Sequence, residues 1–239
     1  SIDATSFTQT AGSGNTNLFG ITVFDGVQTA LRTGAYDDED GGNVSIDTTG
    51  TFFTAGAIIS RGGDTTAAGD GNDAGFVDIA ADTIEVQRID ATGSSAVTSG
   101  DGGAGNTITL DAIGGGTDTI IVHGDLLANA GTGAGGGQAG NAADVQLGDT
   151  DGTFDDLITI APSDTNTGAH NTTADTVLIT GNDIDFYGPV NADPTDANGD
   201  SLTVNTFDNF SQTPIFGITT FHADLGTGVD QVSGTIDDT

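Results

Sequence analysis

The chain has 239 residues, of which only 35% are hydrophobic, and a formal net charge of -32 with three arginines and no lysine. This charge excludes nucleic acid as a partner and disfavours anionic membranes, because both are bound through clustered Lys and Arg. The absence of cysteine excludes a disulfide scaffold and any thiolate metal site. No apolar run approaches the ~18 residues of a membrane span.

The composition favours short strands and tight turns over long helices. The 39 glycines supply the positive-φ conformations that such turns require, and all but two of the 35 acidic residues are aspartates, which are typical of turns. We expect three parts: a strand-rich segment at residues 1–40, solenoid coils at 41–192 and a C-terminal segment at 193–239.

The N-terminal segment carries a motif that returns near the end of the chain. FTQTAGSGNTNLFGITVF at residues 7–24 is similar to FSQTPIFGITTF at residues 210–221, so that each Phe-Gly-Ile-Thr copy lies 197 residues from the other. Either the chain is little more than one unit of a tandem array, or its two ends cap one solenoid or dock head to tail between molecules. Both alternatives predict an elongated object.

Residues 41–192 contain a recurring strand of the form apolar-polar-apolar. Its successive offsets are 33, 31, 37, 32 and 25 residues. An irregular period of this size is typical of a solenoid in which each coil keeps its strands and varies one loop. The aligned pairs are Val44/Ile46, Val77/Ile79, Ile108/Leu110, Val145/Leu147, Val177/Ile179 and Leu202/Val204.

Three short strands are predicted in each coil, with alternate residues pointing towards the axis. The clearest case is residues 77–91, where the inward pairs are Val77/Ile79, Ile84/Val86 and Ile89/Ala91. The fold class predicted is therefore all-β, a right-handed parallel β-helix with loops rich in Gly and Asp. Two further segments repeat the arrangement, with Val44/Ile46, Phe53 and Ala57/Ile59 inward in the first and Val177/Ile179, Ile184/Phe186 and Val190/Ala192 in the second.

Glycine-rich insertions separate the coils at residues 60–75, 93–106 and 129–141. One interpretation is a set of disordered linkers, because ordering chain so rich in glycine costs considerable entropy. The preferred interpretation is a set of ordered loops stacked along one edge of the solenoid.

These repeats resemble those of the filamentous-haemagglutinin class of giant bacterial surface proteins. The resemblance is carried by GGNVSIDTTG (Gly41 to Gly50), GFVDIAADTIEVQRIDATG (Gly75 to Gly93) and GAGNTITLDA (Gly103 to Ala112), and it covers roughly residues 41–192. It implies a parallel β-helix, export to the cell exterior or cell surface, and a role in adhesion or matrix-building. The partners expected are other copies of the chain and a cell-surface glycan or matrix.

Four acidic clusters have the composition of calcium loops, since calcium takes six to eight oxygen ligands from flexible segments. The two favoured as metal sites are DTDGTFDD and DANGD with their flanking acids; solvated turn acids are the alternative. The clusters are Asp37, Asp38, Glu39 and Asp40; Asp70, Asn72 and Asp73; Asp149, Asp151, Asp155 and Asp156; and Asp193, Asp196, Asn198 and Asp200.

The rival to a structural or adhesive fibre is a glycan-cleaving β-helix enzyme, in which paired Asp carboxylates about 5 to 10 Å apart act as acid and base. Such enzymes need aromatic platforms and basic residues for acidic sugars, whereas this chain has two tyrosines, no tryptophan and three arginines. We therefore expect an extracellular fibre protein, stabilised by Ca2+, and not an enzyme.

Overall fold

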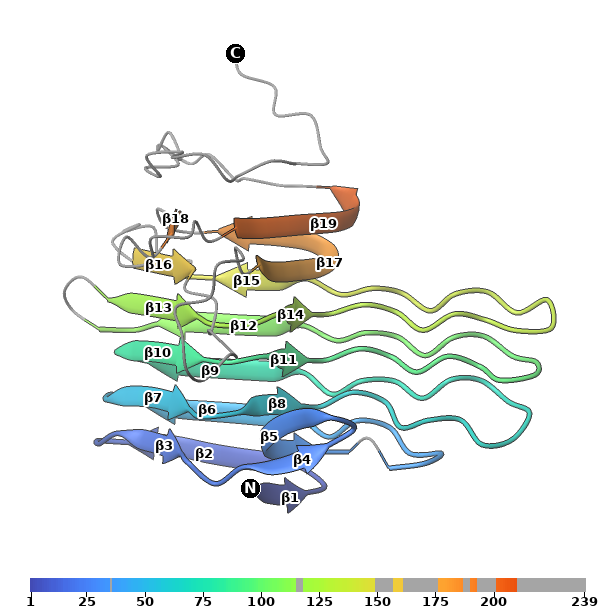
Figure 1. The fold of residues 1–239 in the computed structure, drawn as a ribbon, viewed down its shortest axis with the longest axis horizontal. Helices are drawn as coiled ribbons and strands as arrows, with labels where there is room; N and C mark the ends of the chain where they lie inside the picture. The colour runs from blue at the N-terminus through green and yellow to red at the C-terminus, as the bar shows by residue number, and fades with distance from the viewer. Residues whose placement is uncertain are drawn as a thin grey trace, which may run out of the picture.

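A computed structural model describes residues 1–34, 36–114, 118–148, 157–160, 176–186, 190–192 and 201–209. These residues form a parallel β-solenoid of about 4 turns, and no helix lies among them. The predicted all-β solenoid is confirmed. In Figure 1 the coils are stacked one above another, and long loops leave them on one side.

The coils build three ladders of strands, in which every pairing is parallel. The first ladder contains β2 (Phe7–Gly12), β6 (Val44–Thr48), β9 (Val77–Ala81), β12 (Ile108–Ala112) and β15 (Val145–Leu147). The second contains β3 (Thr16–Leu18), β7 (Thr51–Thr54), β10 (Thr83–Val86), β13 (Thr119–Val122), β16 (Leu157–Ile160) and β18 (Val190–Ala192). The third contains β1 (Ile2–Ala4), β5 (Val27–Thr33), β8 (Ala57–Ile59), β11 (Ile89–Asp90), β14 (Leu126–Leu127) and β19 (Ser201–Asn209).

Two strands depart from this plan. β17 (Thr176–Phe186) pairs with β14 and β19 of the third ladder and then with β15 of the first, so one strand runs through both. β4 (Thr22–Phe24) pairs antiparallel with β5 and forms a hairpin in the first coil. The solenoid stack therefore begins within residues 1–40, and its first coil carries the β4–β5 hairpin on the outside.

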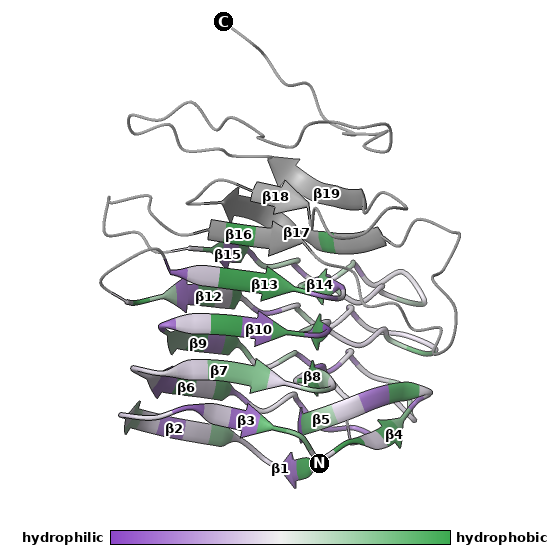
Figure 2. Cartoon of the chain, turned by 60° about the vertical axis from the view of Figure 1, so that its left-hand side comes forward, coloured by the Kyte–Doolittle hydropathy of each residue, from purple (hydrophilic) through white to green (hydrophobic). Residues whose placement is uncertain are grey.

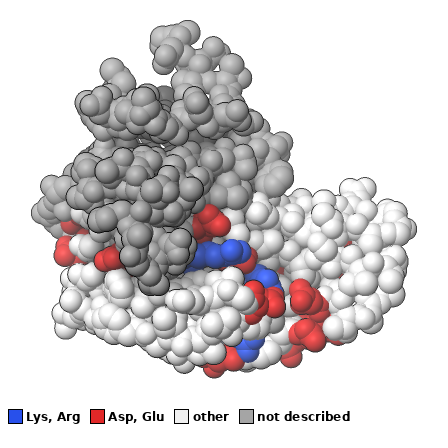
Figure 3. Space-filling view, in the orientation of Figure 1, with Lys and Arg blue, Asp and Glu red and all other residues white. Residues whose placement is uncertain are grey.

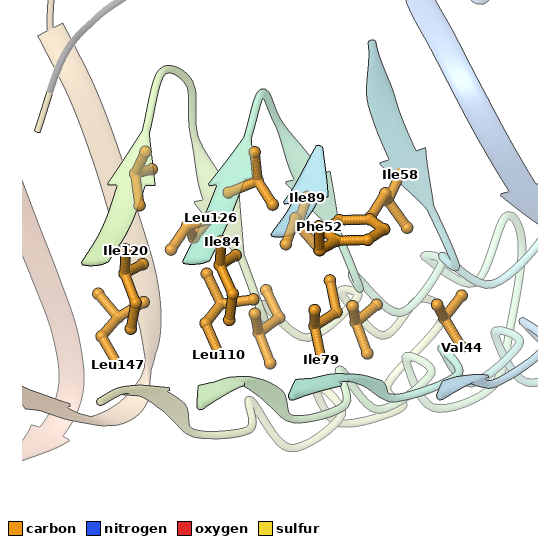
Figure 4. Packing of buried hydrophobic residues seen from close by; sticks show 14 of the residues in the cluster. Val44, Phe52, Ile58, Ile79, Ile84, Ile89, Leu110, Ile120, Leu126 and Leu147 are labelled. Carbon is orange, nitrogen blue, oxygen red and sulfur yellow. The ribbon is translucent and has the colours of Figure 1, made fainter. Parts of the chain in front are cut away.

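The core lies inside the coils, where residues of successive strands stand above one another. Val44, Val77, Ile108 and Val145 form one such row, set by the strand register, and none of them is exposed. Alternation buries every second residue along β6, β7, β9, β10, β12, β13 and β15. Each fully buried aliphatic side chain contributes about 2 kcal/mol. Figure 4 shows these side chains meeting between the ladders, and Figure 2 shows the matching apolar segments on β7, β10 and β13.

The sequence alignment of the first four apolar pairs, from Val44/Ile46 to Val145/Leu147, is confirmed residue by residue, and so are the three inward pairs of residues 77–91. The alignment of Val177/Ile179 with Val145/Leu147 is wrong. Val145 pairs with Ile184, whereas Ile179 pairs with Leu126 of the third ladder. The apolar-polar-apolar pattern occurs in every ladder, so the pattern alone does not say to which one a strand belongs. Leu202 and Val204 do pair with Val177 and Ile179.

Two inward assignments in the second coil are also wrong. Phe52 is fully buried and Phe53 is not, because β7 begins at Thr51 and its alternation places Phe52 in line with Ile84. In β8 the inward residue is Ile58, in line with Ile89. Two adjacent apolar residues give no alternation from which an inward face can be read.

Ala57 and Ile59 are buried for a different reason, because they lie on the outer face of β8 under the hairpin. They form a second small apolar cluster with Phe24 and Val27 of β4 and β5. Phe19, just before β4, lies beside Phe53 with ring centroids 5.3 Å apart. The first Phe-Gly-Ile-Thr copy therefore lies in a segment that packs against the outer face of the second coil.

The glycine-rich insertions, which we call the loop stack (residues 60–75, 93–106 and 129–141), lie in connections of constant length. From the inward residue of the third strand to that of the next first strand there are 19 residues in three successive coils: Ile58 to Val77, Ile89 to Ile108, and Leu126 to Val145. The loop whose length varies from coil to coil lies elsewhere. The longer fourth coil arises between β12 and β13, because Ala81 pairs with Ala112 but Thr83 pairs with Thr119.

Backbone hydrogen bonds order the loop stack. Within a loop the outgoing and returning branches are joined, as by the 2.9 Å bond from Gly103 N to Ser94 O. Between loops the bonds run from coil to coil, as from Gly62 N to Thr92 O at 3.0 Å and from Gly102 N to Gln138 O at 2.8 Å. The branches are so close that a Cβ on Gly102 would lie 2.0 Å from a backbone oxygen of Gly131. Glycine is thus required by close packing here.

Candidate functional site

Aspartates of the predicted acidic clusters connect successive loops, from the loop that precedes β6 into the loop stack. Asp40 Oδ1 accepts a hydrogen bond from Asp73 N at 2.9 Å, and Asp73 Oδ1 accepts one from Ala104 N at 2.7 Å. Since these residues are one coil apart, each carboxylate binds the backbone of the coil above it. Such charge-assisted bonds satisfy amides that no strand ladder pairs.

A second row repeats this arrangement at the far end of the loops. Asp70 Oδ1 accepts from Asp101 N at 2.9 Å, and Asp101 Oδ1 accepts from Gln138 N at 2.7 Å. Asp38 accepts from both the amide and the hydroxyl of Thr66, and these hydrogen bonds, led by the one from the hydroxyl, lower the pKa of Asp38. In these two clusters the aspartates therefore join coils to one another.

No group of three or more His, Cys, Asp or Glu that could hold a metal lies within the residues that the structure describes. The two clusters predicted as calcium sites, Asp149, Asp151, Asp155 and Asp156 together with Asp193, Asp196, Asn198 and Asp200, lie outside the described residues. The second Phe-Gly-Ile-Thr copy, at residues 216–219, lies outside them as well.

All three arginines of the chain lie on the outer face of the third ladder (Figure 3). Arg32 is in β5, Arg61 follows β8 by two residues and Arg88 immediately precedes β11. Their spacings of 29 and 27 residues are close to one coil, which is the sequence signal that could have identified this face. Composition alone indicates no more than three isolated charges.

Each arginine is paired with a carboxylate. Arg32 donates to both oxygens of Asp3, at 3.0 and 2.5 Å, and its guanidinium lies 4.3 Å from the centroid of the Tyr36 ring. This ion pair, with a further hydrogen bond from the Tyr36 hydroxyl, lowers the pKa of Asp3. Arg61 donates to Asp25 of the hairpin.

The third pair differs from the first two because its carboxylate is buried. Arg88 donates from Nη2 to Asp90 Oδ2 at 3.0 Å, and the Asp90 side chain is only 5% exposed. Thr92 N donates to the other Asp90 oxygen at 3.3 Å. Buried charge of this kind is tolerated only when it is paired and hydrogen-bonded.

A cavity of about 490 Å³ opens between Arg61 and Arg88, where the third ladder continues into the loop stack. Outgoing branches of three successive loops contribute to it. Three residues of the wall each have one buried side-chain atom without a hydrogen-bond partner within the described residues, and these atoms are closed to solvent: Arg61 Nε, Arg88 Nε and Asn129 Oδ1. The wall consists of Arg61, Gly62, Asp64, Thr65, Arg88, Asp90, Thr92, Gly93, Ser94, Ser95, Val97, Leu127 and Asn129.

Comparison of the chain with protein-family models, with curated proteins and with solved structures gave no match in any of the three. Among the described residues there is also no helix long and apolar enough to cross a membrane. The fold, the loop stack and the arginine-lined cavity are therefore the features on which a function can be argued.

Proposed function

We propose that the chain is part of an extracellular structural or adhesive fibre built from β-solenoid repeats. The observation that carries this proposal is the loop stack, in which three successive loops of equal length are held out from the body. An ordered projection that buries little apolar surface costs conformational entropy without adding much to the core. A projection of this kind suits display of a surface to the surroundings.

The resemblance to the filamentous-haemagglutinin class gives the proposal its finer form. The same repeats that carry the resemblance form β6, β9, β10, β11 and β12 in the solenoid. A net charge of -32 and the absence of cysteine are compatible with a chain that is exported and works outside the cell. In this proposal the role is binding and assembly, without catalysis.

Self-association is part of the proposal, because the first Phe-Gly-Ile-Thr copy presents apolar side chains to solvent. Phe19 is 67% exposed, Ile21 46% and Val23 67%. Coils at the end of a solenoid also present unpaired strand edges to another chain. Head-to-tail docking of copies and a covalent tandem array both use these features, and the mass of the native chain under denaturing conditions distinguishes them.

The central experiment is localisation combined with imaging. An antibody raised against the loop stack should label intact cells that produce the protein, and negative-stain images of the released protein should show fibres one solenoid wide. Labelling that requires permeabilised cells, or images of compact particles only, would contradict the proposal.

Calcium stabilisation is a second element of the proposal and rests on the sequence of Asp149–Asp156 and Asp193–Asp200. Crowded carboxylates repel one another unless a cation bridges them, and bound calcium would add about 2.7 kcal/mol at a hundredfold excess over its Kd. We expect calcium to raise the Tm above that in chelator or in sodium chloride of matched ionic strength. The gain should shrink in Asp151→Ala or Asp200→Ala; equal Tm in all three conditions would reject calcium binding.

A further inference from the structure

We infer that the second Phe-Gly-Ile-Thr copy, FGITTF at residues 216–221, docks on the outer face of the fourth coil of its own chain. The first copy, FGITVF at residues 19–24, packs in this way on the second coil. The inference goes beyond the proposed function, because it assigns an interaction surface and its occupant wherever the chain works.

The first copy contacts the second coil through three apolar residues. Their partners lie on the corner and the outer side of β7 and β8, which we call the first face (residues 53–59, FTAGAII). The contacts are Phe19 with Phe53, Ile21 with Gly56, and Phe24 with Ala57 and Ile59. A Cβ on Gly56 would lie 2.5 Å from Ile21 Cγ2, so the contact requires glycine.

The second copy keeps every residue that makes these contacts. Phe216, Ile218 and Phe221 stand in the places of the three apolar residues. The single difference between the two copies is Val23, which is 67% exposed and is replaced by Thr220. The second copy can therefore pack on any face that resembles the first.

The fourth coil has such a face, which we call the second face (residues 121–127, IVHGDLL). Strand register places Ile121 in line with Phe53, two coils away. In the same way Leu127 is in line with Ile59. Gly124 lies midway between the two apolar positions, as the glycine of the first face does.

The third coil lies between these two coils and does not repeat the pattern. Glu85 and Asp90 occupy its two equivalent positions. The corner between them is one residue shorter and has no glycine. The pattern is therefore not a general property of the coils, and two faces match two copies.

The two faces differ in how far they are covered. Ile59 is only 2% exposed, because the hairpin with Phe24 lies over it. Leu127, in the same register, is partly exposed and lines the cavity, and Ile121 is partly exposed as well. Covering these side chains with apolar residues would remove them from water, which is favourable.

The chain can bring the second copy to the second face. β19 pairs with β17, which pairs with β14 of the fourth coil. Adjacent strands are about 4.8 Å apart, so β19 lies about 10 Å from β14 along the stack. The seven residues from Asn209 to Phe216 can extend over roughly 23–25 Å. Because the linker is short, the effective concentration of the second copy at this face is high.

The polar residues beside the two faces change together with the copies. Asp25 follows the first copy and pairs with Arg61, just beyond the first face. His222 follows the second copy, and Asp125 occupies in the second face the position of Ala57. An aspartate after the second copy would be repelled by Asp125, whereas a histidine can donate a hydrogen bond to a carboxylate.

Because the chain has no cysteine, disulfide formation in the full chain tests the contact. Ile121→Cys with Phe216→Cys should form an intrachain disulfide under mild oxidation, seen on a non-reducing gel as a monomer without free thiols. Phe19→Cys with Phe53→Cys is the positive control, since these rings lie 5.3 Å apart. Phe53→Cys with Phe216→Cys is the matched control for the other face and should form little disulfide.

A double-mutant cycle tests the same contact without cysteine. Leu127→Ser and Phe221→Ser should each lower the Tm, and the double variant should lower it by less than the sum of the two losses. Ile59→Ser combined with Phe221→Ser is the control, and these two losses should add.

Four results would overturn the inference. Disulfide-linked dimers of Ile121→Cys/Phe216→Cys would place the second copy on another molecule. Equal disulfide formation with Phe53→Cys would remove the preference for the fourth coil. Absence of the disulfide while the positive control forms, or additive losses of Tm for Leu127→Ser and Phe221→Ser, would show that the second copy does not contact this face.

Discussion

The solenoid body and the loop stack are parts of the same coils but are stabilised by different interactions. In the body, rows of Val, Ile and Leu fill the interior, and the strand ladders satisfy the backbone. In the loop stack, small residues bring the chains close enough for backbone bonds, and aspartates such as Asp73 and Asp101 bind amides of the next coil. Burial therefore dominates the first region, and hydrogen bonding dominates the second.

This difference explains how an unusually polar chain folds. A composition that is 35% hydrophobic supports an interior only a few side chains wide, which three short strands per coil provide. The remaining residues are ordered by repetition, because each loop finds in the next coil a neighbour of the same length and shape. We expect substitutions in the two regions to differ both in magnitude and in the extent of unfolding.

The largest effect is expected in the interior of the body. Ile108→Asp would place an unpaired carboxylate in a row between Val77 and Val145, and should reduce the free energy of unfolding by more than about 4 kcal/mol. Thr109→Asp is the matched control, since this neighbouring side chain is only partly buried. Chemical denaturation measures both variants. Similar stability of the two would show that the inward and outward faces are misassigned.

A smaller and more local effect is expected in the loop stack. Gly102→Ala forces its Cβ against the Gly131 carbonyl and should cost about 2 kcal/mol, within the range for overpacking. Hydrogen exchange should show faster exchange of loop amides while amides of β9 and β12 stay protected. Gly14→Ala provides the control, because nothing lies within 4 Å of a Cβ at that position. Equal exchange in both variants would mean that close packing does not hold the loops.

A still smaller effect is expected from the aspartate rows. Asp101→Ala removes the acceptor for Gln138 N and should lower stability by about 1 kcal/mol, whereas Asp101→Asn retains an acceptor oxygen and should lower it less. Thermal unfolding of the two variants makes the comparison. If both variants match the parent chain, the row contributes nothing to stacking and its acids serve only as surface charge.

The body was predictable because burial leaves a pattern with a period of two. Val77/Ile79, Ile84/Val86 and Ile89/Ala91 were each placed correctly from alternation, and the register of four coils followed from the apolar pairs. Prediction failed where alternation is lost, as at the adjacent Phe52 and Phe53, and where one strand passes through two ladders, as in β17.

The loop stack and the cavity were less predictable for physical reasons. Glycine-rich sequence is compatible with disorder as well as with close packing, and only the neighbouring coil decides between them. Arg61, Arg88 and Asn129 come from three different coils, so their meeting depends on the register of the stack. Once that register is known, the near-coil spacing of the arginines indicates that they share a face.

The smallest expected effect is a pH dependence at the outer edge of the first coil. Arg32 and Tyr36 hold the pKa of Asp3 below its usual range, so the folded chain holds this proton less tightly than the unfolded chain does. The Asp3 pair therefore stabilises the fold above the unfolded pKa, and this contribution is lost as the pH falls through the folded pKa. Because the Asp3 side chain is 48% exposed, we expect a Tm difference between the parent chain and Asp3→Asn that is small near neutral pH and disappears in acid. A difference that persists below the folded pKa would show that the substitution itself disturbs the packing of β1, and would remove the ion pair as the cause.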